Sequence, residues 1–252
     1  MAKLDDNQLI GITETGDPCF HLEIFDNLKL ANIIVTKRLT DKLIDKLIEH
    51  SDKCILHLSI TGMGGSKIEP LVPTMHDMYN KFNLLIEKGF PVEQVVLRID
   101  PIVPTSKGIE TAIKVIRLFR DSGIKRMRWS SLDMYPHVIE RFKENKIPLP
   151  YETFHATTLK RRALDSLLEA ACYVADMSIE SCGEPDIESI PCISQKDIDI
   201  LGLNGVITLE GNAEQRSNCH CPANKYQLIK DAPKRCNNGC IYCFWKEKKI
   251  KL

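Results

Sequence analysis

The chain has 252 residues and a mass of 28.6 kDa, and 43% of its residues are hydrophobic while 27% are charged. This composition is typical of a soluble globular protein with one substantial core, and it excludes fibrous, disordered and collagen-like chains. Thirty-four Lys and Arg residues balance thirty-four Asp and Glu residues, so the net charge does not favour a polyanionic partner. Because the start, MAKLDDNQ, lacks an apolar segment and no run approaches the ~18 apolar residues of a membrane helix, we expect a cytoplasmic protein without membrane contact.

Short β-rich runs alternate with amphipathic stretches over the first 180 residues. The predicted strands cover residues 9–13, 33–36, 55–60, 94–99, 126–131 and 177–180. Apolar stripes predict helices over residues 43–48, 109–119 and 164–172, the first of them after an N-cap at Thr40. The proline-broken range 146–155 is interpreted as a connection between helical segments.

This alternation predicts an α/β fold with right-handed crossovers and a parallel sheet, either open and doubly wound or closed as a TIM-type barrel. We favour a TIM-type partial (β/α)6 barrel over residues 1–181, with an extra strand suggested at 206–209. Residues 182–252 form a cysteine-rich segment, which we expect to fold over the C-terminal rim of the strands.

Polar or glycine-rich sequence follows four of the predicted strands, at residues 13–18, 61–66, 98–101 and 130–133. In both architectures ligands bind at the carboxyl ends of the strands, so these residues predict a substrate cleft. We take Asp17, Arg98 and Asp100 as candidate catalytic residues. Each feature also has a structural interpretation: the glycines as a tight turn, Arg98 and Asp100 as an ion pair, and His57 as a core histidine.

Ten cysteines are many for a cytosolic chain, where structural disulfides are rare, so they indicate metal binding or chemistry. Cys19, Cys54 and Cys172 are scattered along the scaffold. The other cysteines gather in the terminal segment, at Cys182, Cys192, Cys219, Cys221, Cys236, Cys240 and Cys243.

Three of these cysteines, Cys236, Cys240 and Cys243, lie in one short loop with three and two intervening residues. They can surround one metal cluster, but the loop offers no fourth ligand. Structural zinc sites and most iron–sulfur clusters take four protein ligands. Three cysteines therefore favour a cluster with one open iron, which can bind a substrate or cofactor directly.

The spacing, with Tyr242 immediately before the third cysteine, resembles the signature of the radical S-adenosylmethionine (SAM) enzymes. The resemblance implies a 4Fe-4S cluster on Cys236, Cys240 and Cys243, whose open iron chelates the amino and carboxylate groups of SAM. One electron, from a donor such as ferredoxin or flavodoxin, then cleaves the sulfonium C–S bond. The products are methionine and a 5′-deoxyadenosyl radical that takes hydrogen from a substrate.

The chain also resembles the bacterial family called domain of unknown function 1848, which is similar to spore photoproduct lyase-type proteins and has members ending in such a cluster. The resemblance covers most of the chain beyond about residue 55 and rests on Ile68-Glu69-Pro70, Val72-Pro73, Arg98-Ile99-Asp100-Pro101, Gln215-Arg216 and Cys219-His220-Cys221. Of the family's turn near its first strand, only Asp17 is equivalent here. The relation implies a nucleic acid, a nucleotide-derived molecule or another small molecule as substrate, with Trp129, Tyr135 and Trp245 either stacking a base or lying in the core.

Radical SAM enzymes usually carry the cysteine loop after the first barrel strand, whereas here it lies near the C-terminus. We therefore expect the terminal segment to fold back onto the same rim. Radical SAM barrels also use a glycine-containing segment to meet the methionyl end of SAM. The resemblance implies cofactor binding by Gly62, Gly64, Gly65 and Glu69, and by Tyr242 of the cysteine loop.

The remaining late cysteines, Cys182, Cys192, Cys219 and Cys221, make a complete four-thiolate shell. We expect them to hold an auxiliary 4Fe-4S cluster, and a structural zinc ion is the alternative. In the purely structural interpretation, the four cysteines are reduced thiols that bind no metal. His220 can replace one thiolate.

Two other functions fit the same residues. One is a non-catalytic zinc- or iron–sulfur-binding module that contacts RNA or a protein through the lysines of residues 246–252. The other is a ferredoxin-like electron carrier.

Overall fold

The computed structural model describes residues 9–213, 218–230 and 236–245. The strands of these residues are β1 (Ile10–Ile12), β2 (Ala31–Thr36), β3 (Cys54–Ser59), β4 (Val95–Ile102), β5 (Arg126–Ser131), β6 (Ser178–Ser181) and β7 (Lys225–Gln227). The α-helices are α1 (Asp41–Glu49), α2 (Met75–Glu87), α3 (Ser106–Leu118), α4 (Pro136–Glu144), α5 (Thr158–Val174) and α6 (Gln195–Ile200). Gln215-Arg216 and the lysine-rich range 246–252 lie outside the described residues.

The strands form one seven-stranded parallel sheet in the order β6-β5-β4-β3-β2-β1-β7. The α/β prediction is confirmed, and the six predicted strands correspond to β1 through β6. The extra strand suggested at 206–209 is wrong, because those residues form a turn and irregular chain. The seventh strand is instead β7, whose three residues, Lys-Tyr-Gln, carry no apolar run that sequence could reveal.

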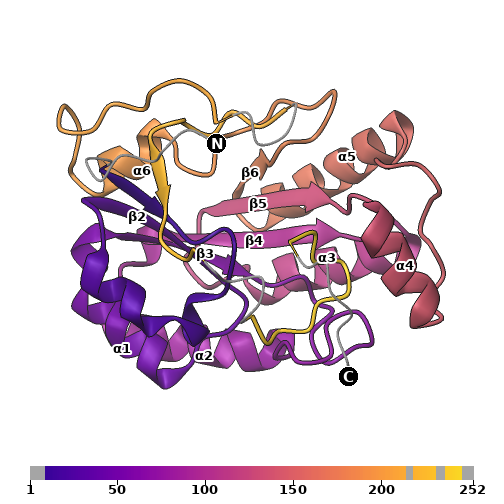
Figure 1. Ribbon diagram of the computed structural model, residues 1–252, viewed down its shortest axis with the longest axis horizontal. Coiled ribbons are helices and arrows are strands. Elements are labelled where there is room, and N and C mark those ends of the chain that lie inside the picture. The colour runs from indigo at the N-terminus through magenta and orange to yellow at the C-terminus, as the bar shows by residue number, and fades with distance from the viewer. Residues whose placement is uncertain (1–8, 214–217, 231–235, 246–252) are drawn as a thin grey trace.

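Helices α1, α2, α3 and α5 cover one face of the sheet, since their apolar residues share a core with the outward residues of β2 through β5. In Figure 1, α1 and α2 lie below the sheet. Helix α1 begins as predicted, because the Thr40 hydroxyl accepts a hydrogen bond from the Leu43 amide at 3.2 Å. Helices α2 and α4 were not predicted, although α2 starts with a capping box of Thr74 and Asp77 and α4 with Pro136.

The cysteine-rich segment covers the opposite face. Ile193, Ile198 and Ile207 pack there with the inward residues of β1 to β4 and with four of the cysteines. Figure 1 shows residues 182–213 of this segment, with α6, running above the sheet. The segment thus completes the sheet's second core and returns to the sheet as β7, beside β1.

The end of the described chain folds back onto the carboxyl ends of the strands, as expected. Cys240, Ile241 and Tyr242 join an apolar cluster with residues from the loops after β3, β4 and β5. The Ile241 amide donates to the Ile68 carbonyl at 3.1 Å, and Arg141 of α4 donates to the carbonyl of Ile241 at 2.9 Å.

The longest described helix, α5, has 17 residues, and none of the described helices combines the length and apolar character that crossing a membrane requires.

Candidate metal centres

A cavity of about 360 Å³ lies at the carboxyl ends of β1 to β5. Its walls come from the residues that follow these strands and from both groups of late cysteines. Cys182, Cys192, Cys219, Cys221, Cys236, Cys240 and Cys243 all line it. The two groups of candidate cysteine ligands, which are separated along the sequence, therefore line the same cavity.

The remaining cysteines have a different setting. Cys54 and Cys172 lie in the core beneath the helices, where burial raises the pKa of each thiol to about 12. They are protonated at neutral pH, as expected for scaffold residues. Cys19 is half-buried, and burial followed by the charge of Asp17 raises the pKa of its thiol as well.

The terminal loop, residues 236–245, presents Cys236, Cys240 and Cys243 to the cavity. Gly239 has a φ of 70°, a left-handed conformation that turns the loop between the first two cysteines. Burial raises the pKa of Cys240 to about 12, while the nearby Lys37 ammonium opposes this shift. A cation beside a buried thiol favours the thiolate form, which is the form that binds metal.

Asp17 ties this loop to the first strand. One of its carboxylate oxygens accepts from Thr36 Oγ1 at 2.7 Å and from the Cys19 amide at 3.2 Å. The other accepts from the Lys37 amide at 2.9 Å and from Asn238 Nδ2 at 2.7 Å. Asp17 lines the cavity, but these four bonds give it the role of a positioning residue rather than the predicted catalytic one.

Glu69 fixes the terminal loop through a hydrogen bond from Tyr242. Its carboxylate is 1% exposed and accepts from Lys37 Nζ at 3.1 Å, from Thr61 Oγ1 at 2.5 Å and from the hydroxyl of Tyr242. Burial, followed by the charges of Cys240 and Glu69, raises the pKa of Tyr242, so its hydroxyl keeps the proton that it donates. Glu69 is absent from the described cavity lining, whereas Tyr242 contributes to it.

The predicted glycine site is also absent from the described cavity lining. A side chain at Gly64 would place its Cβ 1.9 Å from the Pro73 carbonyl oxygen, and Gly62 and Gly65 have φ values of 77° and 76°. These glycines serve a tight turn after β3 that packs against the chain before α2. The geometry of this turn therefore corrects the expectation that Gly62, Gly64, Gly65 and Glu69 contact a cofactor in the cavity.

The second group of cysteines converges beneath the carboxyl end of the sheet. The sulfur atoms of Cys182 and Cys192 are 4.0 Å apart, and the Cys192 amide lies 3.2 Å from the sulfur of Cys221. Hydrogen bonds from Cys182 and Cys221 hold the pKa of Cys192 well below its usual range, and a bond with Cys221 lowers the pKa of Cys219 to about 6. All four are buried, whereas His220 between two of them is exposed and does not replace a thiolate.

Arg98 and Asp100 line the same cavity. Arg98 forms an ion pair with Asp100, and its guanidinium nitrogens lie 3.7 Å from the sulfur of Cys192 and 4.0 Å from that of Cys182. Asp100 also accepts from Ser130 Oγ at 2.5 Å. The ion-pair interpretation is confirmed, and the catalytic role of Arg98 and Asp100 stays a prediction. The pair directs its positive end at two candidate metal ligands.

Further buried groups face the second cysteine group and were not identified from sequence. Arg128 is fully buried in β5, is paired with Glu180, and has a charge that lowers the pKa of Cys192. The period-two pattern of β5, Arg-Met-Arg-Trp, could have revealed the inward arginines.

His57 is wholly buried in β3, and burial followed by the charge of Arg128 holds its pKa well below the usual range. It is the neutral core histidine that the sequence predicted.

Aromatic rings stand at the mouth of the cavity. Tyr135, Phe244 and Trp245 contribute to its walls, with the rings of Tyr135 and Phe244 stacked at a centroid distance of 5.7 Å. Trp129 is fully buried in the core among the helices, so it cannot stack a base.

The donor sets suit the metal groups that the sequence implied. Three thiols from one loop face the cavity, and four buried thiols converge where Arg98 and Arg128 supply positive charge. Buried thiolates require such compensation, by a metal and by nearby cations.

A family model described as Domain of unknown function (DUF1848) matches residues 26–245. No curated protein and no solved structure matches the chain.

Proposed function

The chain belongs to the DUF1848 family, and we propose that it is a radical SAM enzyme with a 4Fe-4S cluster on Cys236, Cys240 and Cys243. The observation that carries the proposal is that these three thiols, from a loop without a fourth ligand, line a cavity at the carboxyl ends of a parallel sheet. When bound, the cluster and SAM would supply a 5′-deoxyadenosyl radical, with methionine as the other product of one-electron cleavage.

The protein's own residues would position and shield this chemistry. Asp17 and Glu69 hold the cysteine loop through Asn238 and Tyr242, while Lys37 places a positive charge beside Cys240. Tyr135 and Trp245 narrow the mouth with apolar surface, which limits access of water to a reactive intermediate. The substrate of this proposal is a small or nucleotide-derived molecule, since the neutral chain offers no general attraction to duplex nucleic acid.

The sheet of this proposal is a partial barrel. Its support is the sequential order of β6 to β1 and the packing of four helices into one core on one face, which is the arrangement of singly wound barrels. The protein acts in the cytoplasm and receives its electron from ferredoxin or flavodoxin.

Cys182, Cys192, Cys219 and Cys221 hold a second metal centre in this proposal. An auxiliary 4Fe-4S cluster would match the first centre. Zinc is favoured by one observation: the 4.0 Å between the sulfurs of Cys182 and Cys192 is close to the ~3.8 Å edge of a tetrahedron with zinc–sulfur bonds of ~2.3 Å. A zinc-only protein would favour the non-catalytic binding module.

The test is an iron, zinc and sulfide count on anaerobically purified protein, followed by reduction with dithionite in the presence of SAM. We expect a brown protein that forms 5′-deoxyadenosine. Cys240→Ala should abolish this product and remove about four iron atoms per chain. Cys172→Ala, which removes a buried thiol in the helix-side core, is the matched control and should retain both. Product formation by Cys240→Ala, or a colourless protein holding only zinc, would refute the proposal.

A further inference from the structure

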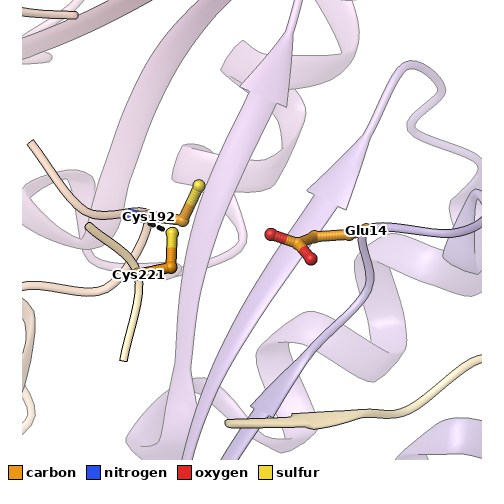
Figure 2. A group of neighbouring side chains, drawn as sticks. All are labelled: Glu14, Cys192 and Cys221. Carbon is orange, nitrogen blue, oxygen red and sulfur yellow. Dashed lines mark hydrogen bonds between the residues drawn. The ribbon is translucent and has the colours of Figure 1, made fainter. Parts of the chain in front are cut away.

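Glu14 faces two cysteines of the second centre. One of its carboxylate oxygens and the sulfur atoms of Cys192 and Cys221 all lie within 4.8 Å of one another. Figure 2 shows the carboxylate pointing toward the two sulfurs. These three residues come from distant parts of the chain, so their meeting is a product of the fold.

The pairing of β1 with β7 brings Glu14 to this place. Ile12 pairs with Gln227, and the amide of Glu14 donates to the side-chain oxygen of Gln227 at 2.9 Å. Cys221 lies four residues before Lys225, the first residue of β7. The register places Glu14 beyond the carboxyl end of this strand pair, whereas Cys221 precedes the amino end of β7. Cys221 comes close to Glu14 because the chain before β7 packs on the face of the sheet, in one buried cluster with Ile10 and Ile12 of β1.

Lys225 orients the carboxylate. Its side chain is 6% exposed, and its ammonium group donates to Glu14 Oε1 at 2.8 Å. A carboxylate has about four lone-pair positions, so an ion pair with lysine leaves room for a metal on the same group. Carboxylates that bind metals are commonly held in this way by a second hydrogen-bonding partner.

The donor set selects a class of metal. Two sulfurs and one carboxylate oxygen suit zinc or iron, whereas magnesium and calcium prefer oxygen ligands alone. The Glu14 side chain is 18% exposed, and both cysteines are buried. The carboxylate already has one cation beside it, the ammonium of Lys225, and a bound metal would compensate the charge of the two cysteines in the thiolate form that binds metal.

We infer that Glu14 is a ligand of the second metal centre, which is therefore a mixed carboxylate–thiolate site for a zinc- or iron-type cation, with Glu14, Cys192, Cys221 and one of the other two cysteines, Cys182 or Cys219, as the four ligands. The inference rests on the second centre of the proposed function, and it does not depend on SAM cleavage at the terminal loop. It adds to the site a ligand from the first strand, more than 170 positions before Cys192.

The test is binding of Co²⁺ and Zn²⁺ to the metal-stripped full-length protein, measured by the sulfur-to-cobalt absorption and by competition with a chelator. Glu14→Gln and Glu14→Ala should weaken the tightest binding step about 10- to 100-fold. Glu14→Asp and Glu14→Cys, which retain a ligand, should recover most of the affinity, and Glu14→Cys should intensify the absorption by adding a thiolate. Glu110→Gln is the matched control, because Glu110 pairs with Lys114 at 2.7 Å on the exposed side of α3.

Unchanged affinity in Glu14→Gln and Glu14→Ala would overturn the inference. Equal loss in Glu14→Gln, Glu14→Ala and Glu14→Cys, with recovery in Glu14→Asp alone, would also overturn it, because Glu14 would then act only through its ion pair with Lys225. Circular dichroism verifies that each variant is folded, and Glu14→Asp serves if Glu14→Ala is not. A SAM-cleavage assay on the same wild-type preparation separates the two proposals, since loss of cleavage with Glu14-dependent metal binding would refute only the radical SAM function.

Discussion

Replacing Tyr242 with Phe tests how the terminal loop is held in place. The substitution keeps the ring in its apolar cluster and removes the hydroxyl that donates to the buried carboxylate of Glu69. A hydrogen bond to a charged group contributes about 1.5–3 kcal/mol. Because this hydrogen bond joins the loop to Glu69, its loss should weaken docking of the loop. The equilibrium constant between the docked and undocked loop should fall by a factor of about 10 to 150.

Hydrogen exchange measured by mass spectrometry reports this docking directly. We expect amides of residues 236–245 in Tyr242→Phe to exchange faster by that factor, while protection of β3 and β4 stays unchanged. Tyr173→Phe is the matched control, because Tyr173 is 87% exposed on α5 and should show no effect. Equal protection of the loop in both variants would refute the claim that Glu69 and Tyr242 anchor the cysteine ligands.

Two further changes test the charges around the cavity. Burial raises the pKa of Glu184 to about 7, so the folded protein holds a proton that the unfolded chain releases near pH 4.5, the usual pKa of a glutamate. Glu184 therefore contributes on the order of 3 kcal/mol to the free energy of unfolding below pH 4.5, and this contribution is lost as the pH rises to 7. In urea unfolding, the free energy of unfolding of Glu184→Gln should not fall over this pH range as that of the wild type does. Arg98→Gln removes the cation beside the second cysteine group and should make the reduction potential of a metal cluster there more negative in voltammetry, whereas exposed Arg117→Gln should not. An unchanged pH slope or an unchanged potential would contradict the respective assignment.

Local patterns predicted the parts of this protein that depend on neighbours in sequence. Hydrophobic periodicity revealed six strands of the parallel sheet, and the spacing of Cys236, Cys240 and Cys243 identified one ligand group within a single loop. The other late cysteines, Cys182, Cys192, Cys219 and Cys221, share one buried cluster, and their role as metal ligands stays a prediction.

Local sequence patterns gave wrong predictions where one residue type can have either a functional or a structural role. The glycines after β3 have the composition of a ligand loop, yet Gly64 is required because the Pro73 carbonyl occupies the place of a side chain. Asp17 has the position of a catalytic acid but is saturated by hydrogen bonds from the backbone and from Thr36 and Asn238. The three-residue strand β7 is too short and too polar to show the alternation of apolar and polar residues that identifies a strand in a sequence.

The sequence by itself determined the parallel α/β scaffold and predicted which cysteines could bind a metal, because strand periodicity and loop spacing are properties of adjacent residues. Only the tertiary structure decided that Asn238 meets Asp17, that Tyr242 meets Glu69 and that Glu14 meets Cys221. These pairs are separated by 173 to 221 positions along the chain. The first two pairs meet because a parallel sheet gathers the carboxyl ends of its strands at one edge, and the returning terminal segment packs on that edge. Glu14 and Cys221 meet because the chain before β7 packs on the face of the sheet that carries Ile10 and Ile12 of β1.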